Sequence, residues 1–323
     1  MRDVSLKQLR VVAAVARTGK ILSAAGSLGV TPPAVTQQLR QLEDSLGVAL
    51  FERTREGMQL TQAGHHVMES AARIEAELAA CADWFQTMRG LKGGSVSIGV
   101  VSTAKYFAPA ALGEFKRRHP DVELRLFVAN REETIRALAA LELDVAIMGR
   151  PPENLDVNAT VLGDHPHIIV ARPDHSLASR RALAITDISG ETFLMREQGS
   201  GTRILMERLF TQAGIAPHVA MEISSNETIK QAVIGGLGIA FISAHTVAAE
   251  IEMKRLVMLD VAGLPVWRQW WAVHHKEKRL MPAPSALLRF LEEEGRSFLP
   301  PSPIPAFPSP AFPSPPFPVP GAD

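Results

Sequence analysis

The sequence predicts an α/β protein with a helix-rich amino-terminal domain, a long connecting helix and two α/β lobes. Three observations support this prediction. Apolar residues recur at helical spacing as far as Arg89, the pair Gly93-Gly94 ends that pattern, and strands alternate with helices from Val96 onward. We therefore divide the chain of 323 residues into an amino-terminal domain (1–66), a linker helix (67–92), an α/β domain (93–299) and a tail (300–323).

The composition is that of a globular protein and excludes several other classes. Hydrophobic residues make up 46% of the chain and charged residues 21%, as in folded domains. A single cysteine excludes a disulfide framework and a cysteine-rich zinc site. No segment approaches the roughly 18 consecutive apolar residues of a membrane span, and the chain starts without a signal-peptide pattern. We expect a cytoplasmic protein with no membrane partner.

The net charge of zero is an average over unlike parts. Residues 1–66 contain eight Lys or Arg and five Asp or Glu, an excess of three positive charges. Since the whole chain has 34 residues of each sign, the remainder carries three negative charges in excess. A basic amino-terminal segment on an otherwise mildly acidic chain indicates a nucleic-acid partner.

Three helices are predicted in the amino-terminal domain. The first begins at Leu6, has apolar residues at positions 9, 12, 13 and 16, and ends at Thr18-Gly19. Small side chains over residues 23–30 predict a short second helix that can approach its neighbour closely. Thr31 suits the N-cap of a third helix, and Pro32 suits its first position.

The third helix has two chemically different faces. One face carries Thr36, Gln37 and Arg40, whose side chains can bond base edges or phosphates. The other is an apolar stripe of Val35, Leu39, Leu42 and Leu46. Two helices joined by a short turn, the second with a polar face, are typical of a helix-turn-helix. The alternative is a three-helix packing unit without a role in DNA binding.

Residues 50–61 predict two short strands around a turn, which would form the wing of such a domain. Arg53 and Arg55 give this segment basic character, whereas Glu56 weakens it.

Taken together, these residues closely resemble the winged helix-turn-helix of LysR-type transcriptional regulators. The segments that carry the resemblance are Ala24-Ala25, Val30–Leu39, Leu42-Glu43, Leu46-Gly47 and Leu50–Arg53, followed by Leu60–Gly64 at the junction of wing and linker. The resemblance covers residues 2 to about 299. It implies recognition-helix contacts to double-stranded DNA by Thr31, Pro32, Thr36, Gln37 and Arg40, and wing or backbone contacts by Arg53 and Arg55.

Gln37 departs from the pattern of many relatives, which have arginine at this position. Arginine reads guanine through two hydrogen bonds, whereas glutamine reads adenine. The base preference of those relatives therefore does not carry over to this position.

The linker carries a heptad seam. Its apolar residues are spaced four and three apart: Val67, Ala71, Ile74, Leu78, Cys81, Phe85 and Met88. We expect this helix to pair with its copy in a second chain and to present two recognition helices to a pseudo-palindromic site. A single amphipathic helix packed on its own domain is the alternative. Cys81 is interpreted as a small apolar filler of the seam.

The α/β domain begins with the order strand, helix, strand, helix, strand. The strands are expected over 96–101, 123–129 and 144–148, with helices over 107–118 and 132–141 between them, which is the signature of a parallel sheet. A second series of strands and helices follows as far as residue 242, then a strand near 269–274 and a helix over 283–298. Such an arrangement resembles the type 2 periplasmic-binding-protein fold, with lobe 1 over about 95–163 and 268–299 and lobe 2 over about 164–267.

Ligands of open α/β sheets bind at the carboxyl ends of strands, often on helix N-termini. The loops predicted there carry hydroxyl, amide and basic groups: Ser102, Thr103, Lys105, Asn130, Arg150, Ser200, Thr202 and Asn226. In LysR-type regulators the positions matching Ser102, Thr103 and Thr202 line an effector cleft between the lobes. Together these loops favour an anion site, while ordinary helix capping explains any one of the hydroxyl or amide groups equally well.

Further details resemble the LysR-type regulators of Calvin-cycle operons, which serve carbon dioxide fixation. They are Ile147–Pro152, Arg196–Arg203, Ser224–Val233, and Trp267 with Trp270-Trp271. The resemblance implies a homodimer or homotetramer that activates those genes with RNA polymerase. It implies no cofactor, and an effector that is an anionic metabolite, such as a phosphorylated one, or NADPH. The alternatives are a LysR-type regulator of another metabolic operon and a solute-binding protein, which normally lacks the DNA-binding domain.

Catalytic and metal-binding motifs find little support. No nucleophile elbow or Walker motif is present, and Gly235-Gly236-Leu237-Gly238 precedes a predicted strand instead of following one. His165 and His167 have no acidic or cysteine partner placed by spacing, so neither an enzyme nor a metal site is predicted. The tail has 11 prolines in its 24 residues and is expected to be disordered, either as a dispensable segment or as a ligand of a proline-binding module.

Overall fold

The computed structural model describes residues 4–54, 57–88 and 93–301 and divides into two compact units. Of the described residues, unit 1 comprises those up to Gly163 and Trp270–Phe298, and unit 2 comprises Asp164–Gln269 and 299–301. The chain passes from one unit to the other within strand β6 (Val157–Ala171) and returns within strand β11 (Val266–His275). Each unit is described separately below.

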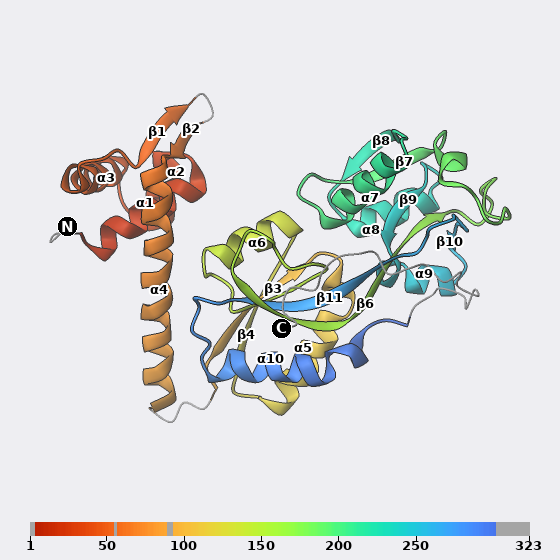
Figure 1. Cartoon of the computed structure of the whole chain (residues 1–323). Coiled ribbons are helices and arrows are strands. Elements are labelled where there is room, and N and C mark those ends of the chain that lie inside the picture. Colours follow the sequence, from red (N-terminus) through yellow and green to blue (C-terminus); the bar gives the residue numbers. More distant parts are fainter. Residues whose placement is uncertain (1–3, 55–56, 89–92, 302–323) are drawn as a thin grey trace, which may run out of the picture. The chain divides into compact units, whose positions relative to one another are not determined.

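Unit 1 begins with the three predicted helices, α1 (Leu6–Thr18), α2 (Ile21–Leu28) and α3 (Pro32–Leu46) (Figure 1). Each is followed by a glycine, and all three glycines adopt the left-handed conformation that terminates helices. The predicted first and third helices are confirmed, and the second begins two residues before the predicted start. Thr31 occupies the N-cap position of α3, but its side chain makes no capping hydrogen bond.

The predicted wing is an antiparallel hairpin of β1 (Phe51–Thr54) and β2 (Gly57–Leu60), which pairs Phe51 with Leu60. The wing rests on the end of α1, because the Met58 N–H donates to the Gly19 carbonyl oxygen at 2.9 Å. A Cβ at Gly57 would lie 2.5 Å from that oxygen, and its φ of +131° also disfavours a side chain. Close contact with α1 therefore requires glycine here.

Helix α4 (Gln62–Met88) continues from the wing as one long helix (Figure 1). Thr61 joins its start to the preceding chain: its hydroxyl donates to the Ala49 carbonyl at 2.8 Å and accepts the Gly64 N–H at 3.0 Å. A side chain at Gly64 would meet the Leu50 carbonyl oxygen at 2.1 Å. The first turn of α4 is thus packed directly onto the amino-terminal domain.

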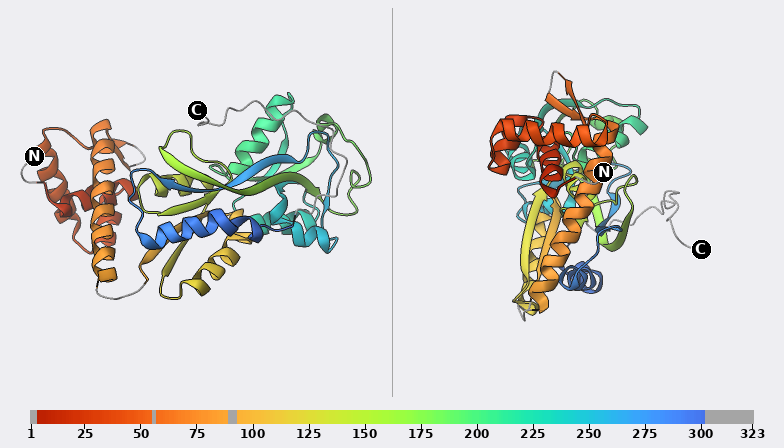
Figure 2. Two further views of the ribbon diagram at one scale, coloured as in Figure 1. Left: turned by 60° about the horizontal axis from the view of Figure 1, so that its bottom comes forward. Right: turned by 90° about the vertical axis from the view of Figure 1, so that its left-hand side faces the viewer.

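The remainder of unit 1 is built on a sheet in the order β11-β5-β3-β4. Strand β3 (Ser95–Val101) is parallel to both β4 (Glu123–Ala129) and β5 (Val145–Met148), as predicted, and β11 is antiparallel to β5. Helix α6 (Arg131–Ala139) packs on β3, and α5 (Ala108–Arg118) and α10 (Pro282–Glu294) lie side by side (Figures 1 and 2), with Phe115 and Phe290 in contact. Short 3₁₀ turns precede α5, at Ala104–Tyr106, and follow α10, at Gly295–Phe298.

Unit 2 combines antiparallel and parallel strand pairs. Strand β6 pairs antiparallel with both β9 (Ala240–Ser243) and β10 (Val257–Met258), whereas β7 (Thr192–Arg196) and β8 (His218–Ile223) are parallel. Strand β10, helix α9 (Ala248–Glu252) and the first half of β6 were not predicted. The reason is physical: polar Asn158 and Thr160 interrupt the apolar residues of 157–161, none of which is buried, and β10 has only two residues, so neither segment produces an apolar run.

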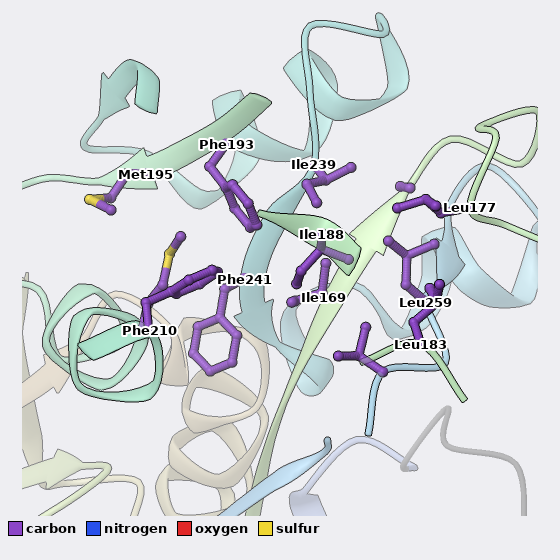
Figure 3. Packing of buried hydrophobic residues seen from close by; sticks show 13 residues of the cluster. Ile169, Leu177, Leu183, Ile188, Phe193, Met195, Phe210, Ile239, Phe241 and Leu259 are labelled. Atoms are coloured by element: carbon purple, nitrogen blue, oxygen red, sulfur yellow. The ribbon is translucent and has the colours of Figure 1, made fainter. Parts of the chain in front are cut away.

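Helices α7 (Gly201–Gln212) and α8 (Asn226–Ile234) begin directly after β7 and β8, as expected from the sequence, and short 3₁₀ turns occur at Ile185–Ile188 and Ala244–Thr246. Aromatic and aliphatic side chains of β6, β7, β9 and α7 converge in one cluster (Figure 3). Within it the rings of Phe193 and Phe210 meet edge to face, with centroids 5.0 Å apart. This cluster holds α7 against the sheet through Met206 and Phe210. Over the described ranges, no helix is long and apolar enough to cross a membrane.

Candidate functional sites

The two faces of α3 differ in burial as the sequence predicts. Val35 and Leu42 are fully buried in the core of the amino-terminal domain, together with Leu39. Thr31, Thr36, Gln37 and Arg40 are exposed, and Pro32 is half-buried. The helical period places these two sets on opposite sides, so burial of the apolar stripe leaves the polar side chains facing outward.

The hydrogen bonds within the chain determine which donors and acceptors of these exposed side chains remain free. The Thr36 hydroxyl donates to the Pro32 carbonyl at 3.1 Å, so its oxygen remains as an acceptor and its proton is in use. Gln37 and Arg40 make no hydrogen bond to any part of the chain that the structure describes. Amide and guanidinium groups that are exposed and uncommitted in this way are suited to base edges and phosphates.

Glu43 has a supporting role that sequence reasoning missed. Its carboxylate Oε1 accepts the backbone N–H of Leu50 at 2.7 Å and that of Phe51 at 3.4 Å. One side chain of α3 thereby fixes the start of the wing relative to the recognition helix. Charge-assisted bonds of this kind are stronger than neutral ones. The signal in the sequence was an acidic residue seven positions before a buried leucine, which identifies no partner by itself.

The wing presents Arg53 on β1, where it is exposed. Arg55, the second predicted wing contact, and Glu56 lie outside the described residues.

Helix α4 divides the predicted seam into two parts. Val67 is half-buried and Ala71 buried against the amino-terminal domain, which matches the alternative of packing on the helix's own domain. Further along, Ile74, Leu78, Cys81 and Phe85 are exposed, and the side chain of Met88 lies outside the described residues. Trp84, which the prediction omitted, is 51% exposed and meets Phe85 edge to face at 5.2 Å. The distal part of α4 therefore exposes a row of large apolar side chains.

In unit 1, the predicted loop after β3 is only partly available. The Ser102 N–H donates to the Ala129 carbonyl at 2.8 Å and is thus committed to the edge of the sheet, so this backbone donor is not available to an anion. Thr103 is buried, and Lys105 is half-buried with its ammonium 5.2 Å from the centroid of the Tyr106 ring.

Asn130 and Arg150 both have partners within unit 1. The Asn130 side chain accepts the Glu133 N–H at 3.0 Å, and the Glu133 carboxylate accepts the Asn130 N–H at 3.3 Å, so Asn130 caps α6. Arg150 forms an ion pair with Glu153. Arg131, which was not predicted, donates to the carbonyl oxygens of Arg150 and Pro151, the latter at 3.3 Å, and holds this loop on the start of α6.

In unit 2, the predicted residues Ser200, Thr202 and Asn226 are all buried at helix starts. Ser200 occupies the N-cap position of α7 without a side-chain cap bond. Ser225 caps α8 instead of Asn226, since its hydroxyl accepts the Thr228 N–H at 3.3 Å. Ordinary capping therefore does not account for the side chains of Ser200 and Asn226.

Arg196, at the end of β7, is the main residue of this region that sequence reasoning did not select. It is 3% exposed; its guanidinium donates to both carboxylate oxygens of Glu197, at 2.7 and 2.8 Å, and to Oδ1 of Asn226 at 2.6 Å. Arg203 donates in turn to the Arg196 carbonyl at 3.1 Å and pairs with Glu207 and Glu222, whose hydrogen bonds raise its pKa. Asn226, the partner of Arg196, lies thirty positions away, so no local sequence pattern indicates this pair.

Three histidines are buried together in unit 2. The rings of His165 and His167 lie 4.2 Å apart, and the ring of His245 lies 6.2 Å from that of His165. Burial lowers the pKa of His167 to about 3 and that of His245 to about 4, so both are neutral at pH 7. Among the described residues, no group of three or more His, Cys, Asp or Glu side chains is arranged to hold a metal ion.

This geometry defines a class of protein. A winged helix-turn-helix with an uncommitted polar face, a long helix with an exposed apolar row, and two α/β units are the parts of a transcriptional regulator. The helix-turn-helix of bacterial regulatory proteins of the lysR family matches residues 6–65, and the LysR substrate binding domain matches residues 89–296. The chain belongs to the LysR family of transcriptional regulators, as the sequence analysis predicted. The names of its relatives indicate a regulator instead of an enzyme.

Similar proteins extend this result. The chain is 52% identical over 301 residues to the HTH-type transcriptional regulator CbbR of Xanthobacter flavus, covering 93% of this chain and 90% of that protein. It is 43% identical to the RuBisCO operon transcriptional regulator of Allochromatium vinosum, covering 90% and 96%. Among solved structures, the CcmR regulatory domain of Synechocystis PCC6803 in complex with 2-PG is 37% identical with a TM-score of 0.60, covering 62% of this chain and 96% of that one.

Proposed function

We propose that this chain activates transcription of a carbon dioxide fixation operon in response to an anionic metabolite. One observation carries the proposal: identity of 52% over 93% of the chain to a CbbR regulator, including both the DNA-binding and the α/β domains. The similar protein of Allochromatium vinosum is named for the RuBisCO operon. The protein acts on promoter DNA in the cytoplasm.

DNA contacts are assigned to the exposed face of α3 and to the wing. Gln37 donates to and accepts from an adenine edge, while Arg40 bonds a guanine or a phosphate. Thr31, Pro32 and Thr36 line the same face, and Arg53 and Arg55 contact the backbone. Support comes from burial, because the opposite face of α3 is fixed in the core and Thr36, Gln37 and Arg40 are exposed.

Two copies of the chain are expected to pair through α4. The exposed side chains Ile74, Leu78, Trp84 and Phe85 form an apolar row that a second helix can cover, while Val67 and Ala71 anchor the helix to its own domain. Pairing presents two recognition helices, which suits a pseudo-palindromic operator. We further propose that two dimers form a tetramer. The tetramer then recruits RNA polymerase to activate transcription.

The effector is proposed to be an anionic metabolite, such as a phosphorylated one, or NADPH. Ser102, Thr103, Lys105, Asn130 and Arg150 of unit 1 and Ser200, Thr202 and Asn226 of unit 2 are its proposed contacts. The similar CcmR regulatory domain was solved in complex with 2-PG, and this complex supports an effector bound in the α/β domain. Asn130 and Arg150 must exchange their partners Glu133 and Glu153 to reach a ligand.

Regulation requires that the effector prefer one conformation of the protein. A ligand that binds both conformations equally cannot shift their populations, however tightly it binds. We propose that the effector-bound state changes the angle between dimers on DNA, relaxes the DNA bend and allows polymerase to bind.

The test is footprinting of the full chain on the divergent promoter next to its own gene, with phosphorylated sugars and NADPH titrated separately. We expect protection of two half-sites and a changed footprint with one of these metabolites. A footprint and bend that stay unchanged for every metabolite contradict the effector assignment. Absence of any protected site on this promoter, with protection on the promoter of another operon, contradicts the operon assignment.

A further inference from the structure

Unit 2 contains a compact polar group formed by Arg196, Glu197 and Asn226. The side chain of Arg196 is 2% exposed and that of Glu197 is 17% exposed. Nε and Nη2 of Arg196 donate to the two carboxylate oxygens of Glu197, and Nη1 donates to Oδ1 of Asn226 at 2.6 Å. The guanidinium therefore holds a carboxylate in the two-pronged geometry that also suits a phosphate.

The hydrogen bond from Arg196 determines the orientation of the Asn226 amide. An arginine side chain only donates hydrogen bonds, so the Asn226 atom that faces it must be the oxygen. The amide nitrogen Nδ2, with its two protons, is therefore directed elsewhere. It is buried and has no hydrogen-bond partner among the residues that the structure describes. Buried amide donors are nearly always paired, so this one points to an acceptor supplied by a ligand.

The surroundings of this amide favour a negatively charged acceptor. Asn226 is the first residue of α8, whose nine residues direct the positive end of their dipole toward it. The Arg196 guanidinium adds a full positive charge at 2.6 Å from the same side chain. The α7 start is tied to this group as well, because Arg203 donates to the Arg196 carbonyl at 3.1 Å.

We propose that Arg196 and Asn226 form an oxyanion subsite whose internal occupant, the Glu197 carboxylate, is displaced by the phosphate of the effector. The incoming phosphate takes the positions of the two Glu197 oxygens on Arg196 and accepts from Nδ2 of Asn226. Glu197 is the member of the pair that can leave, since it is more exposed than Arg196 and turns toward water. This inference rests on the proposed function in one respect, namely that the effector is an anion.

An internal competitor makes the subsite selective. Because Glu197 is covalently attached next to Arg196, its effective concentration is high, and a weak anion cannot replace it. A phosphate carries up to two negative charges and three acceptor oxygens, whereas a carboxylate carries one charge and two oxygens, as Glu197 does. The subsite therefore favours phosphate esters over plain carboxylic acids.

The test measures binding of small anions to the full chain by calorimetry, without DNA. The probes are 3-phosphoglycerate, glycerol 3-phosphate and glycerate, which separate the phosphate from the carboxylate. Wild-type protein is expected to bind the two phosphate esters and not glycerate. The substitution Glu197→Gln retains the shape of the side chain but removes its charge, and is expected to tighten phosphate binding roughly tenfold.

Glu227→Gln is the matched control for the change in net charge. Glu227 lies in the first turn of α8, is half exposed, and pairs with Lys230 at 2.9 Å. Its substitution changes the net charge equally but leaves the Arg196 fork occupied, so phosphate affinity is expected to stay at the wild-type value. An equal gain in both variants would show a general charge effect and overturn the proposal.

Asn226→Asp supplies a second, independent variant. It keeps the acceptor toward Arg196 and replaces the amide donor by a carboxylate oxygen, so phosphate binding should weaken roughly tenfold or more while the melting temperature stays near that of wild type. Unchanged phosphate affinity in Asn226→Asp, or no gain in Glu197→Gln, overturns the subsite. These measurements use no DNA, so their failure leaves the promoter function intact, and a failed footprint leaves the subsite intact.

Discussion

On α3, Gln37 and Arg40 are exposed and make no hydrogen bond in the described part of the chain, whereas Arg196 of unit 2 is buried and bonded to Glu197 and Asn226. The first arrangement needs only the removal of water before a base or phosphate binds. The second must exchange an internal partner for an external one. Gln37 and Arg40, which are proposed to read DNA, are thus free of partners within the described chain, while Arg196, which is proposed to bind a metabolite, is already bonded to internal partners.

The comparison also concerns how each region is supported. The polar face of α3 depends on a small apolar core, in which Val35 and Leu42 have no exposed surface. The Arg196 group depends on a larger cluster in unit 2 and on its own hydrogen bonds. We therefore expect that a substitution that disrupts one core will leave ligand binding by the other region intact.

The largest effect is expected from Leu42→Ala. Removing a fully buried leucine side chain costs about 2–5 kcal/mol, which is a large part of the stability of so small a domain. Denaturant unfolding should show an earlier transition for the amino-terminal domain, and promoter binding should be lost while calorimetric anion binding remains. The control is Leu237→Ala, because Leu237 is 53% exposed and should change little. Simultaneous loss of anion binding in Leu42→Ala would contradict the separation of the two regions.

Acid should destabilise unit 2 more than the amino-terminal domain. The pKa of His167 is lowered to about 3, chiefly by burial and further by Arg268 and His245, against the backbone bond to His165. Since the unfolded chain binds a proton near pH 6.5 and the folded chain does not, stability is fully present above that pH. It then falls by about 1.4 kcal/mol per pH unit for this histidine until the folded pKa is reached.

The measurement is the free energy of unfolding between pH 7 and pH 4, in wild type and in His167→Phe. Phenylalanine retains a flat ring next to Phe241, whose centroid lies 5.5 Å from that of His167, and should make the slope shallower. Among its described residues the amino-terminal domain has no buried histidine, so that domain should respond less. An identical slope in both proteins would show that His167 does not contribute.

A smaller effect is expected at Glu43. Glu43→Ala removes the acceptor of the Leu50 and Phe51 N–H groups and should cost about 1–3 kcal/mol, because both donors belong to buried residues. Glu43→Gln retains an acceptor oxygen and should lose less. Thermal unfolding separates the two variants. If both lose equally, the charge and not the hydrogen bond fixes the wing.

The sequence was most informative where chemistry repeats at short range. The stripe of Val35, Leu39 and Leu42 determined which face of α3 is buried, and the structure confirms that register. The parallel pairing of β3 with β4 and β5 also followed from the order of elements. Antiparallel pairing of β6 with β9 did not, because spacing predicts elements but not their partners.

At the residues proposed to bind the ligand, the sequence could not distinguish an asparagine that caps a helix from one that does not. Asn130 and Asn226 both follow predicted strands, yet Asn130 caps its helix and Asn226 does not. The difference depends on Ser225, which takes the cap position, and on Arg196, which is thirty residues away. Long-range hydrogen bonds of this kind depend on the packed fold.

The central claim, that α3 reads DNA through its uncommitted polar face, is tested most directly by fluorescence anisotropy with a labelled promoter fragment. Wild type, Gln37→Ala and the control Gln212→Ala, an exposed glutamine at the end of α7, are titrated over a series of salt concentrations. We predict steep salt dependence in all three proteins and a loss of about 1–3 kcal/mol of promoter preference over scrambled DNA in Gln37→Ala alone. Equal promoter preference in wild type and Gln37→Ala would contradict the account.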